Sequence, residues 1–379
     1  MPDTAPISDF NLRTLNTQEY EQHLETTIEF GGNLLAVGRR GSGKTAICLS
    51  AIKARKYRPV ICNLSVYDRV DLMGYPLLFD RSSKSRFVEY LLPSLFKHLI
   101  DGDIPSVLVL DEIDKCDSSL LAPLLELLQF RSINDTQLPN LKACVATANL
   151  VAEGGQRPSL PLLDRMEKYL VSADAKRWMD WAPSANIHPS VVAFIHDNPS
   201  ELQGAIENDE LYADQSPRGW EHTSKLMWFG ETNKVDKSIL INKVSGCVGK
   251  KSGDLYRNYY EHYQTLLPII DRVMKGETVK EFYKLEITKQ FVGAMIICNR
   301  VAKMIDDFSP ELRKDLRIAP NTAPQVLKTV GKFLQTIDRE FALMCVRGTI
   351  GVQRMLSIKL ENVEGFEELL DELQKRLKN

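Results

Sequence analysis

The sequence of this 379-residue chain predicts an α/β core with a mostly parallel, five-stranded sheet, followed by an all-helical region. Three observations support this fold class. Between residues 33 and 172, five apolar runs of strand length alternate with helical stretches, a pattern typical of parallel sheets covered on both faces. A glycine-rich segment joins the first run to a helix. From about Asn186 the strand pattern fades, and apolar residues recur at helical spacing.

The predicted elements follow one another in a simple order. A short helix over residues 17–30 precedes the first strand, and a helix over residues 46–54 follows it. Between the second and third strands, residues 71–92 place two apolar pieces around a turn-rich centre, which predicts an inserted hairpin. A second polar excursion covers residues 131–140. The five predicted strands are Asn33–Val37, Pro59–Leu64, Val107–Leu110, Lys142–Ala148 and Lys168–Val171.

The helical pattern continues to the end of the chain, with predicted helices over residues 288–305, 323–346 and 365–379. We therefore divide the chain into four segments. They are an N-terminal segment (1–30), an α/β domain (31–183), a helical domain (184–275) and a C-terminal helical extension (276–379).

The composition is that of an ordinary globular protein, with 44% hydrophobic and 26% charged residues. The net charge of -2 gives no global electrostatic case for nucleic-acid binding, although a local basic groove stays open. Seven scattered cysteines without a C-x-x-C pair favour reduced thiols over disulfides or a zinc site. Without a leader pattern or an apolar run of membrane-spanning length, we expect a cytoplasmic protein.

The glycine-rich segment has the spacing of a phosphate-binding loop, Gly-x-x-x-x-Gly-Lys-Thr. Glycines allow the backbone to wrap tightly and direct its N–H groups at an anion, while the helix N-terminus and the lysine add positive charge. The threonine hydroxyl can reach Mg²⁺. The alternative is a glycine-rich turn with a solvated lysine. The residues predicted to bind a nucleotide are Gly38, Arg39, Arg40, Gly41, Ser42, Gly43, Lys44 and Thr45.

Two acids follow the third strand run, in the segment "VLVLDEID". Asp111 and Glu112 emerge at the carboxyl end of a buried strand, where ligands bind in open α/β sheets. Asp111 there can hold Mg²⁺, and Glu112 can polarise an attacking water. The alternative is a solvated strand end followed by a helix cap. Together with the loop, the pair predicts ATP or GTP binding.

Three further polar residues are candidates for the same chemistry. Asn149 ends the fourth run and could orient the lytic water, or could simply terminate the strand. Arg165, just before the fifth predicted strand in the chain, could neutralise phosphoryl charge, or could form a surface pair with Asp164. Arg218 lies in the first turn of a helix, where a cation is unfavourable unless an anion faces it; a plain surface position is the alternative.

The ordered segments "GRRGSGKT", "VLVLDEID", "VATAN", "LLDRM" and "SPRGW" resemble the Walker A, Walker B, sensor 1, arginine-finger and sensor 2 elements of AAA+ ATPases. More narrowly, the insertion "DLMGYPLL" and the helix "SPRGWEHTSKLM" resemble those of bacterial and phage MoxR-like proteins. The resemblance covers about residues 20 to 350. Leu150 and Met166 depart from it, since proline and phenylalanine are common at these positions in the family.

The resemblance implies a role for each matching residue. Lys44 would contact the β and γ phosphates, while Thr45 and Asp111 would hold Mg²⁺. Glu112 would activate water that Asn149 positions. The two arginines would act on phosphate from different places: Arg165 on the neighbouring subunit's nucleotide, and Arg218 on the nucleotide of its own subunit.

We therefore expect an Mg²⁺-dependent ATPase that forms a homo-oligomeric ring and remodels a protein partner. The resemblance implies that the ring is a hexamer. The insertion, with Tyr75 near its tip, is the candidate substrate-facing loop, although Tyr75 could instead pack under the hairpin. Two alternatives stay open. One is a DNA-acting motor or loader, and the other is an adaptor in which slow hydrolysis times nucleotide-gated assembly.

Overall fold

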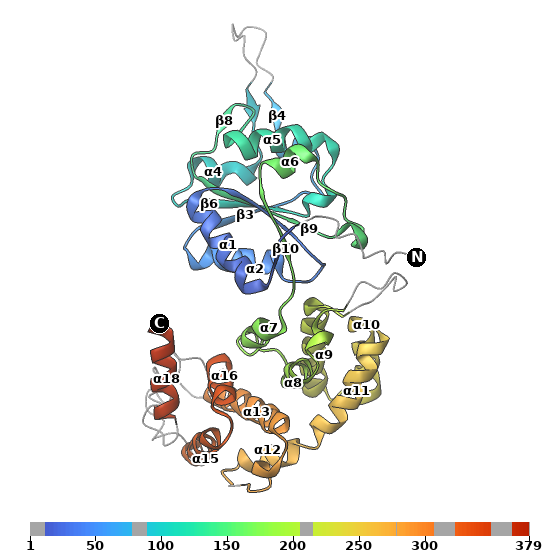
Figure 1. The fold of residues 1–379 in the computed structure, drawn as a ribbon, viewed down its shortest axis with the longest axis vertical. Coiled ribbons are helices and arrows are strands. Elements are labelled where there is room, and N and C mark those ends of the chain that lie inside the picture. The colour runs from blue at the N-terminus through green and yellow to red at the C-terminus, as the bar shows by residue number, and fades with distance from the viewer. Residues whose placement is uncertain are drawn as a thin grey trace. The chain divides into compact units, whose positions relative to one another are not determined.

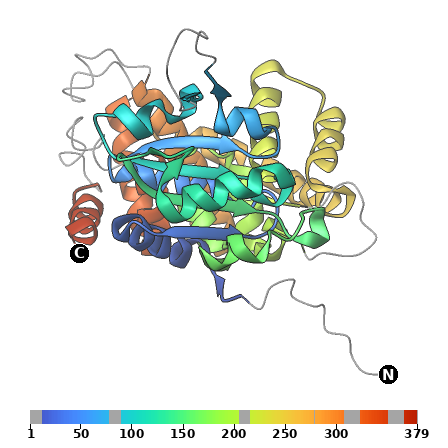
Figure 2. The same cartoon turned by 90° about the horizontal axis from the view of Figure 1, so that it is seen from above.

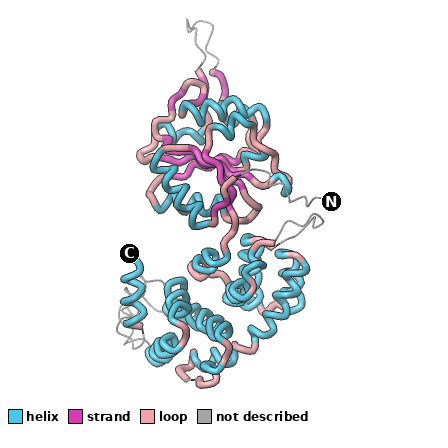
Figure 3. Tube along the Cα trace, in the orientation of Figure 1, coloured by secondary structure: helices cyan, strands magenta, loops and turns pink. Residues whose placement is uncertain are grey.

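The chain forms two compact units, Met1–Asp174 and Ala175–Asn379. Within the described part of the chain, strands occur only in the first unit, whereas the second is helical (Figures 1 and 3). The predicted fold class, a parallel-sheet α/β core followed by helices, is therefore confirmed. The finer domain boundaries at residues 183 and 275 stay predictions. The computed structural model describes residues 12–77, 89–204, 215–277, 279–306, 323–349 and 366–378.

The first unit is built on a six-stranded sheet in which all neighbouring strands are parallel. The strand order is β1-β10-β2-β9-β6-β3, and Figure 2 shows these strands from above. Five strands match the predicted runs to within one residue at either end, but the predicted total of five was wrong. The strands are β1 (Thr14–Leu15), β2 (Asn33–Val37), β3 (Arg58–Asn63), β6 (Ser106–Asp111), β9 (Leu141–Ala148) and β10 (Glu167–Val171).

The sixth strand is β1, which adds to the edge of the sheet beside β10. Two backbone hydrogen bonds hold it there, from Leu170 N–H to the Arg13 carbonyl (3.0 Å) and from Ser172 N–H to the Leu15 carbonyl (3.0 Å). A two-residue strand is too short to show a periodic apolar pattern, which is why the sequence did not predict it.

Two hydrophobic cores lie on the two faces of this sheet. Leu34 and Ala36 of β2 pack into the core that contains α1 and α2, whereas Leu35 and Val37 pack into the core that contains α5. Figure 1 shows α1 and α2 on one side of the sheet and α4, α5 and α6 on the other. Burial of both faces explains why the central strands β2, β6 and β9 are largely apolar. The helices are α1 (Thr17–Phe30), α2 (Lys44–Ala54), α3 (Arg69–Met73), α4 (Lys97–Asp101), α5 (Leu121–Phe130) and α6 (Leu160–Asp164).

Two short antiparallel pairs extend from this core. β4 (Tyr75–Pro76) pairs with β5 (Tyr90–Leu91) at the base of the predicted insertion, and β7 (Ser132–Ile133) pairs with β8 (Thr136–Gln137) in the second polar excursion. Tyr75 pairs with Leu91 at the base of the insertion, so the prediction that it lies near the tip was wrong. It is 65% exposed, so it does not pack under the hairpin as the alternative required. The predicted turn of the insertion, residues 80–85, lies outside the described residues.

The second unit packs around aromatic side chains. The rings of Phe194 and Trp220 lie 5.0 Å apart, and Tyr256 contacts both. No described helix in either unit is long and apolar enough to cross a membrane. The helices are α7 (Ala175–Trp181), α8 (Pro189–Asp197), α9 (Pro217–Asn233), α10 (Lys237–Val248), α11 (Lys250–Gln264), α12 (Leu267–Val273), α13 (Ile287–Asp306), α15 (Ala323–Thr336), α16 (Arg339–Thr349) and α18 (Glu367–Lys378).

The prediction of one continuous helix over residues 323–346 was wrong, because the structure has α15 and α16 with a break between them. Asp338 lies in the break, and its carboxylate accepts a hydrogen bond from the backbone N–H of Glu340 (3.0 Å). An aspartate in this position caps a new helix rather than continuing the old one.

Candidate nucleotide-binding site

The glycine-rich loop connects the carboxyl end of β2 to the first turn of α2. Gly41 and Gly43 have φ angles of 72° and 92°, in the left-handed region that favours glycine. At Gly38 the constraint is space: a Cβ atom would lie 2.4 Å from the carbonyl oxygen of Val171 at the end of β10. The glycine spacing therefore serves both a wrapped backbone and a close approach to the sheet.

Lys44 lies over this loop and is 7% exposed. Its Nζ donates hydrogen bonds to the carbonyl oxygens of Gly38 (2.8 Å) and Arg39 (2.7 Å). The N-cap of α2 is Gly43, which has no side chain to accept bonds from the N–H groups of the first turn. A helix N-terminus with its positive dipole end and a buried ammonium together favour an anion at this point.

Asp111, the last residue of β6, faces the start of α2. Its Oδ1 accepts a hydrogen bond from the hydroxyl of Thr45 (2.9 Å), so the structure brings together two of the residues predicted to hold Mg²⁺. Hydroxyl and carboxylate oxygens are hard ligands of the kind Mg²⁺ prefers. The donor set of Thr45 and Asp111 therefore fits this ion.

A second hydroxyl on Asp111, that of Thr147 on β9, was missed by the sequence reasoning. It is buried, donates to the same Oδ1 of Asp111, and accepts a hydrogen bond from the backbone N–H of Glu112 (3.3 Å). The signal was present in the segment "VATAN", where Thr147 is the one polar residue inside an otherwise apolar strand end. Thr147 thus fixes the side chain of Asp111 and the backbone of Glu112.

Glu112 has a left-handed backbone, with φ of 56°, which is uncommon for a residue with a side chain. Its carboxylate forms an ion pair with Lys115 (3.2 Å), and both side chains are partly exposed. An exposed pair of this kind contributes little stability, so Glu112 can exchange its partner for a water molecule at small cost.

Asp114 is a further acid that the sequence reasoning did not use. Its side chain is buried, and its Oδ1 accepts the backbone N–H of Asn149 (3.0 Å) at the end of β9. Its Oδ2 has no hydrogen-bond partner among the described residues. Burial raises the pKa of Asp114 above its usual value, against the opposing effect of the Asn149 N–H. Asp114 therefore anchors the backbone that carries Asn149.

The structure places Arg165 at the other end of the strands. Its Nε donates to Oε1 of Gln129 (3.0 Å), and its Nη1 donates to the carbonyl of Pro161 (2.9 Å). Its own carbonyl accepts a hydrogen bond from the side-chain amide of Asn33, the first residue of β2 (2.9 Å). Arg165 is thus not brought together with Lys44, which lies beyond the glycine-rich loop at the opposite, carboxyl end of that strand.

Arg218 belongs to the helical unit, where it is exposed in the first turn of α9. The hydroxyl of Ser216 caps this helix by accepting the N–H of Gly219 (3.2 Å), and Pro217 occupies the first helical position. The role of Arg218 toward a phosphate stays a prediction.

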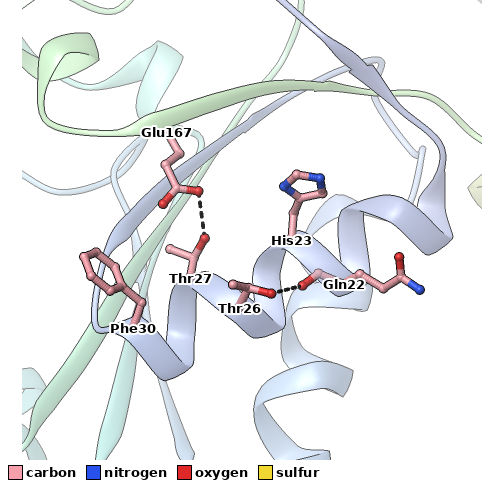
Figure 4. A pocket seen from close by; sticks show the side chains of 6 residues that line it. All are labelled: Gln22, His23, Thr26, Thr27, Phe30 and Glu167. Carbon is pink, nitrogen blue, oxygen red and sulfur yellow. Dashed lines mark hydrogen bonds between the residues drawn. The ribbon is translucent and has the colours of Figure 1, made fainter.

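A surface pocket of about 280 Å³ lies between α1 and β10, away from these residues (Figure 4). The Thr27 hydroxyl donates to Glu167 (2.9 Å), and the Thr26 hydroxyl donates to the Gln22 carbonyl (2.9 Å), so several polar groups already satisfy one another. Glu167 begins β10, whereas the phosphate loop meets the end of that strand. The pocket is lined by Gln22, His23, Thr26, Thr27, Phe30 and Glu167.

The cysteines add no reactive or metal-binding centre that the described residues reveal. All seven are thiols, and no cluster of three or more His, Cys, Asp or Glu side chains within the described ranges could hold a metal. Cys48 packs on the buried face of α2, where burial raises its pKa to about 12 and keeps the thiol neutral.

No protein-family model and no curated protein matches this sequence. The RuvB Holliday junction branch migration motor of Thermotoga maritima is similar with 14% identity and a TM-score of 0.36, over 69% of this chain and 76% of that one. NtrX from Brucella abortus in complex with ADP is similar with 12% identity and a TM-score of 0.37, over 95% and 67%. TM-scores this low do not indicate what this chain does, so a function has to be argued from the residues of the chain itself.

Proposed function

We propose that this chain is an Mg²⁺-dependent ATPase of the AAA+ type, with a MoxR-like organisation. The observation that carries the proposal is the 2.9 Å contact between Thr45 and Asp111, beside the N-terminus of α2 and the buried Lys44. Residues 66 positions apart in the sequence meet where a phosphate loop needs its metal ligands.

The chemistry follows from what these side chains can do. Lys44 would exchange the Gly38 and Arg39 carbonyls for phosphate oxygens, so its N–H groups would stay hydrogen-bonded throughout. Thr45 and Asp111 would hold Mg²⁺, which would neutralise phosphate charge when bound. Glu112 would leave Lys115 and accept a proton from the attacking water.

Asn149 would orient that water. The hydrogen bond from its backbone N–H to Asp114 supports this role, because it fixes the residue at the end of β9, adjacent in the sheet to β6. Oriented polar groups that need no rearrangement during the reaction contribute most to stabilising a charged transition state.

The ring is the second part of the proposal. Arg165 is held at the amino ends of the strands, so it would serve a nucleotide bound by a neighbouring copy rather than its own. The exposed Tyr75 at the base of the insertion supports a protein partner as the substrate of remodelling.

The test is Mg²⁺-dependent ATP hydrolysis by the purified full chain, with Lys44→Ala and Glu112→Gln as variants. We expect Lys44→Ala to lose nucleotide binding, and Glu112→Gln to retain binding while losing turnover. Hydrolysis at the wild-type rate by both variants would refute the enzyme assignment. Salt-sensitive stimulation by DNA would replace the protein partner with a nucleic acid.

A further inference from the structure

The loop that follows β9 is tied to the Asp111–Asp114 segment at both of its ends. The N–H of Asn149 donates to Asp114 Oδ1 (3.0 Å), and the N–H of Gln156 donates to the Asp114 carbonyl (3.1 Å). Between them, the N–H of Gly155 donates to the Leu150 carbonyl (3.1 Å). A Cβ atom at Gly155 would lie 2.7 Å from the Asn149 carbonyl, so the turn is closed tightly.

Glu153 extends from this loop to the phosphate loop. Its Oε1 accepts a hydrogen bond from Arg39 Nε (2.8 Å), and its Oε2 accepts one from the backbone N–H of Arg40 (2.7 Å). The side chains of Arg39 and Glu153 are only 14% and 7% exposed. Both bonds are charge-assisted and short, and solvent screens them little.

The two donors lie in the first half of the phosphate loop. Arg39 and Arg40 precede Gly41, whereas Lys44, Thr45 and the first-turn N–H groups of α2 follow it. Glu153 therefore supports the part of the loop that precedes the anion-binding groups in the chain. A segment with several glycines has large conformational freedom, and a fixed carboxylate reduces the entropy lost when the loop closes on a ligand.

We infer that Glu153 is a positioning residue for nucleotide binding, which holds the phosphate loop in its binding shape from the loop that carries Asn149. The inference rests on the proposed function, since it concerns the same nucleotide. Glu153 touches no reacting atom, and it acts through Arg39 and Arg40.

The test measures the Kd of Mg-ADP by calorimetry on the full chain, together with KM and kcat for ATP. We expect Glu153→Ala to weaken binding and raise KM by roughly 10-fold or more, the effect of losing charge-assisted hydrogen bonds. The kcat at saturating ATP should change far less. Glu153→Gln keeps an acceptor for one donor but loses the charge, so its Kd should lie between those of wild type and Glu153→Ala.

The matched control is Glu25→Ala, which removes another Glu–Arg ion pair, with Arg55 (2.6 Å), at the opposite end of α2. This control should bind Mg-ADP like wild type. In a variant that already carries Arg39→Ala, the further change Glu153→Ala should raise the Kd of Mg-ADP by a smaller factor than it does in the wild-type background, because one hydrogen-bond partner of Glu153 is already gone.

The outcomes separate the two claims. A wild-type protein that binds no Mg-ADP would overturn the proposed function and, with it, the role of Glu153. A wild-type protein that binds while Glu153→Ala and Glu153→Gln bind equally well or more tightly would overturn the role of Glu153 alone. The midpoint temperature of thermal unfolding is measured for each variant, and each Kd is measured well below that temperature. The Kd values then refer to folded protein.

Discussion

The buried hydroxyl of Thr147 connects Asp111, the last residue of β6, with Glu112, the residue after it, and replacing it tests the candidate site directly. Thr147 is 2% exposed, donates to Asp111 and accepts the N–H of Glu112. Thr147→Val keeps the shape of the side chain but removes both hydrogen bonds. We expect the variant to lose stability and ATP turnover together, because the same hydroxyl holds the metal-ligand carboxylate and the backbone of the proposed base.

The expected loss of unfolding free energy depends on which hydrogen bonds Asp111 and Glu112 retain in Thr147→Val. Asp111 keeps the Thr45 hydroxyl at 2.9 Å, so its carboxylate is not left without a donor. The Glu112 N–H loses its Thr147 acceptor, and this residue already has a left-handed backbone that its surroundings must hold in place. A lost bond to a carboxylate and a partly buried N–H left unpaired give an expected loss of about 2–4 kcal/mol.

Urea denaturation measures the free energy of unfolding, and steady-state ATP hydrolysis measures turnover. The control is Thr147→Ser, which keeps the hydroxyl and should lose only about 1 kcal/mol for the missing methyl group. If the valine and serine variants lost the same stability and turned ATP over equally, the hydroxyl would have no part in holding Asp111 and Glu112, and the reasoning would be wrong.

Three further predictions concern single positions. Gly38→Ala should destabilise the protein and weaken nucleotide binding in calorimetry, because its Cβ would lie 2.4 Å from a backbone carbonyl oxygen of β10. Gly246→Ala in α10 is the control: its Cβ would meet nothing within 4 Å, so the free energy of unfolding should rise by about 0.5–1 kcal/mol. Burial raises the pKa of Asp114, so the wild-type protein loses stability as pH rises from about 4, the pKa of an unfolded aspartate, through the higher pKa of the folded state. Asp114→Asn should therefore become more stable relative to wild type over this pH range. A stability difference in urea titrations that does not vary with pH would refute this. Tyr256→Phe breaks the buried bond to Ser190 and should lower unfolding free energy by about 1 kcal/mol.

The parts of the site that the sequence predicted are those whose residues lie close together in the chain. The phosphate loop is one short segment with fixed spacing, and its glycines have the close contacts or left-handed angles that the spacing implies. The buried strands were equally predictable from the sequence, because strands covered on both faces of a sheet are continuous apolar runs. Local patterns therefore sufficed for the five longer strands, the loop and the position of Asp111.

The missed residues depend on contacts between distant segments. Thr147 meets Asp111 across 36 positions, and Glu153 meets Arg39 across 114. A threonine in a strand and a glutamate after it have many ordinary roles, and only the strand order places these two beside the loop. Asp114 was missed for a related reason, since its distinction is an unpartnered buried oxygen that no local pattern reveals.

The two ends of β10 explain why the proposed ATPase should depend on assembly. Val171, at its carboxyl end, contacts Gly38 of the phosphate loop, while Arg165 lies just before its first residue, Glu167. Five residues of strand span roughly 16 Å, and Gln129 holds the guanidinium of Arg165 at the far end. Arg165 therefore cannot serve the phosphates of its own loop. Diluted wild-type protein should bind Mg-ATP as tightly as concentrated protein but hydrolyse it more slowly per subunit, and Arg165→Ala should be slow at every concentration. Rates that are independent of both concentration and Arg165 would mean that Lys44 and the acids after β6 act without a neighbour.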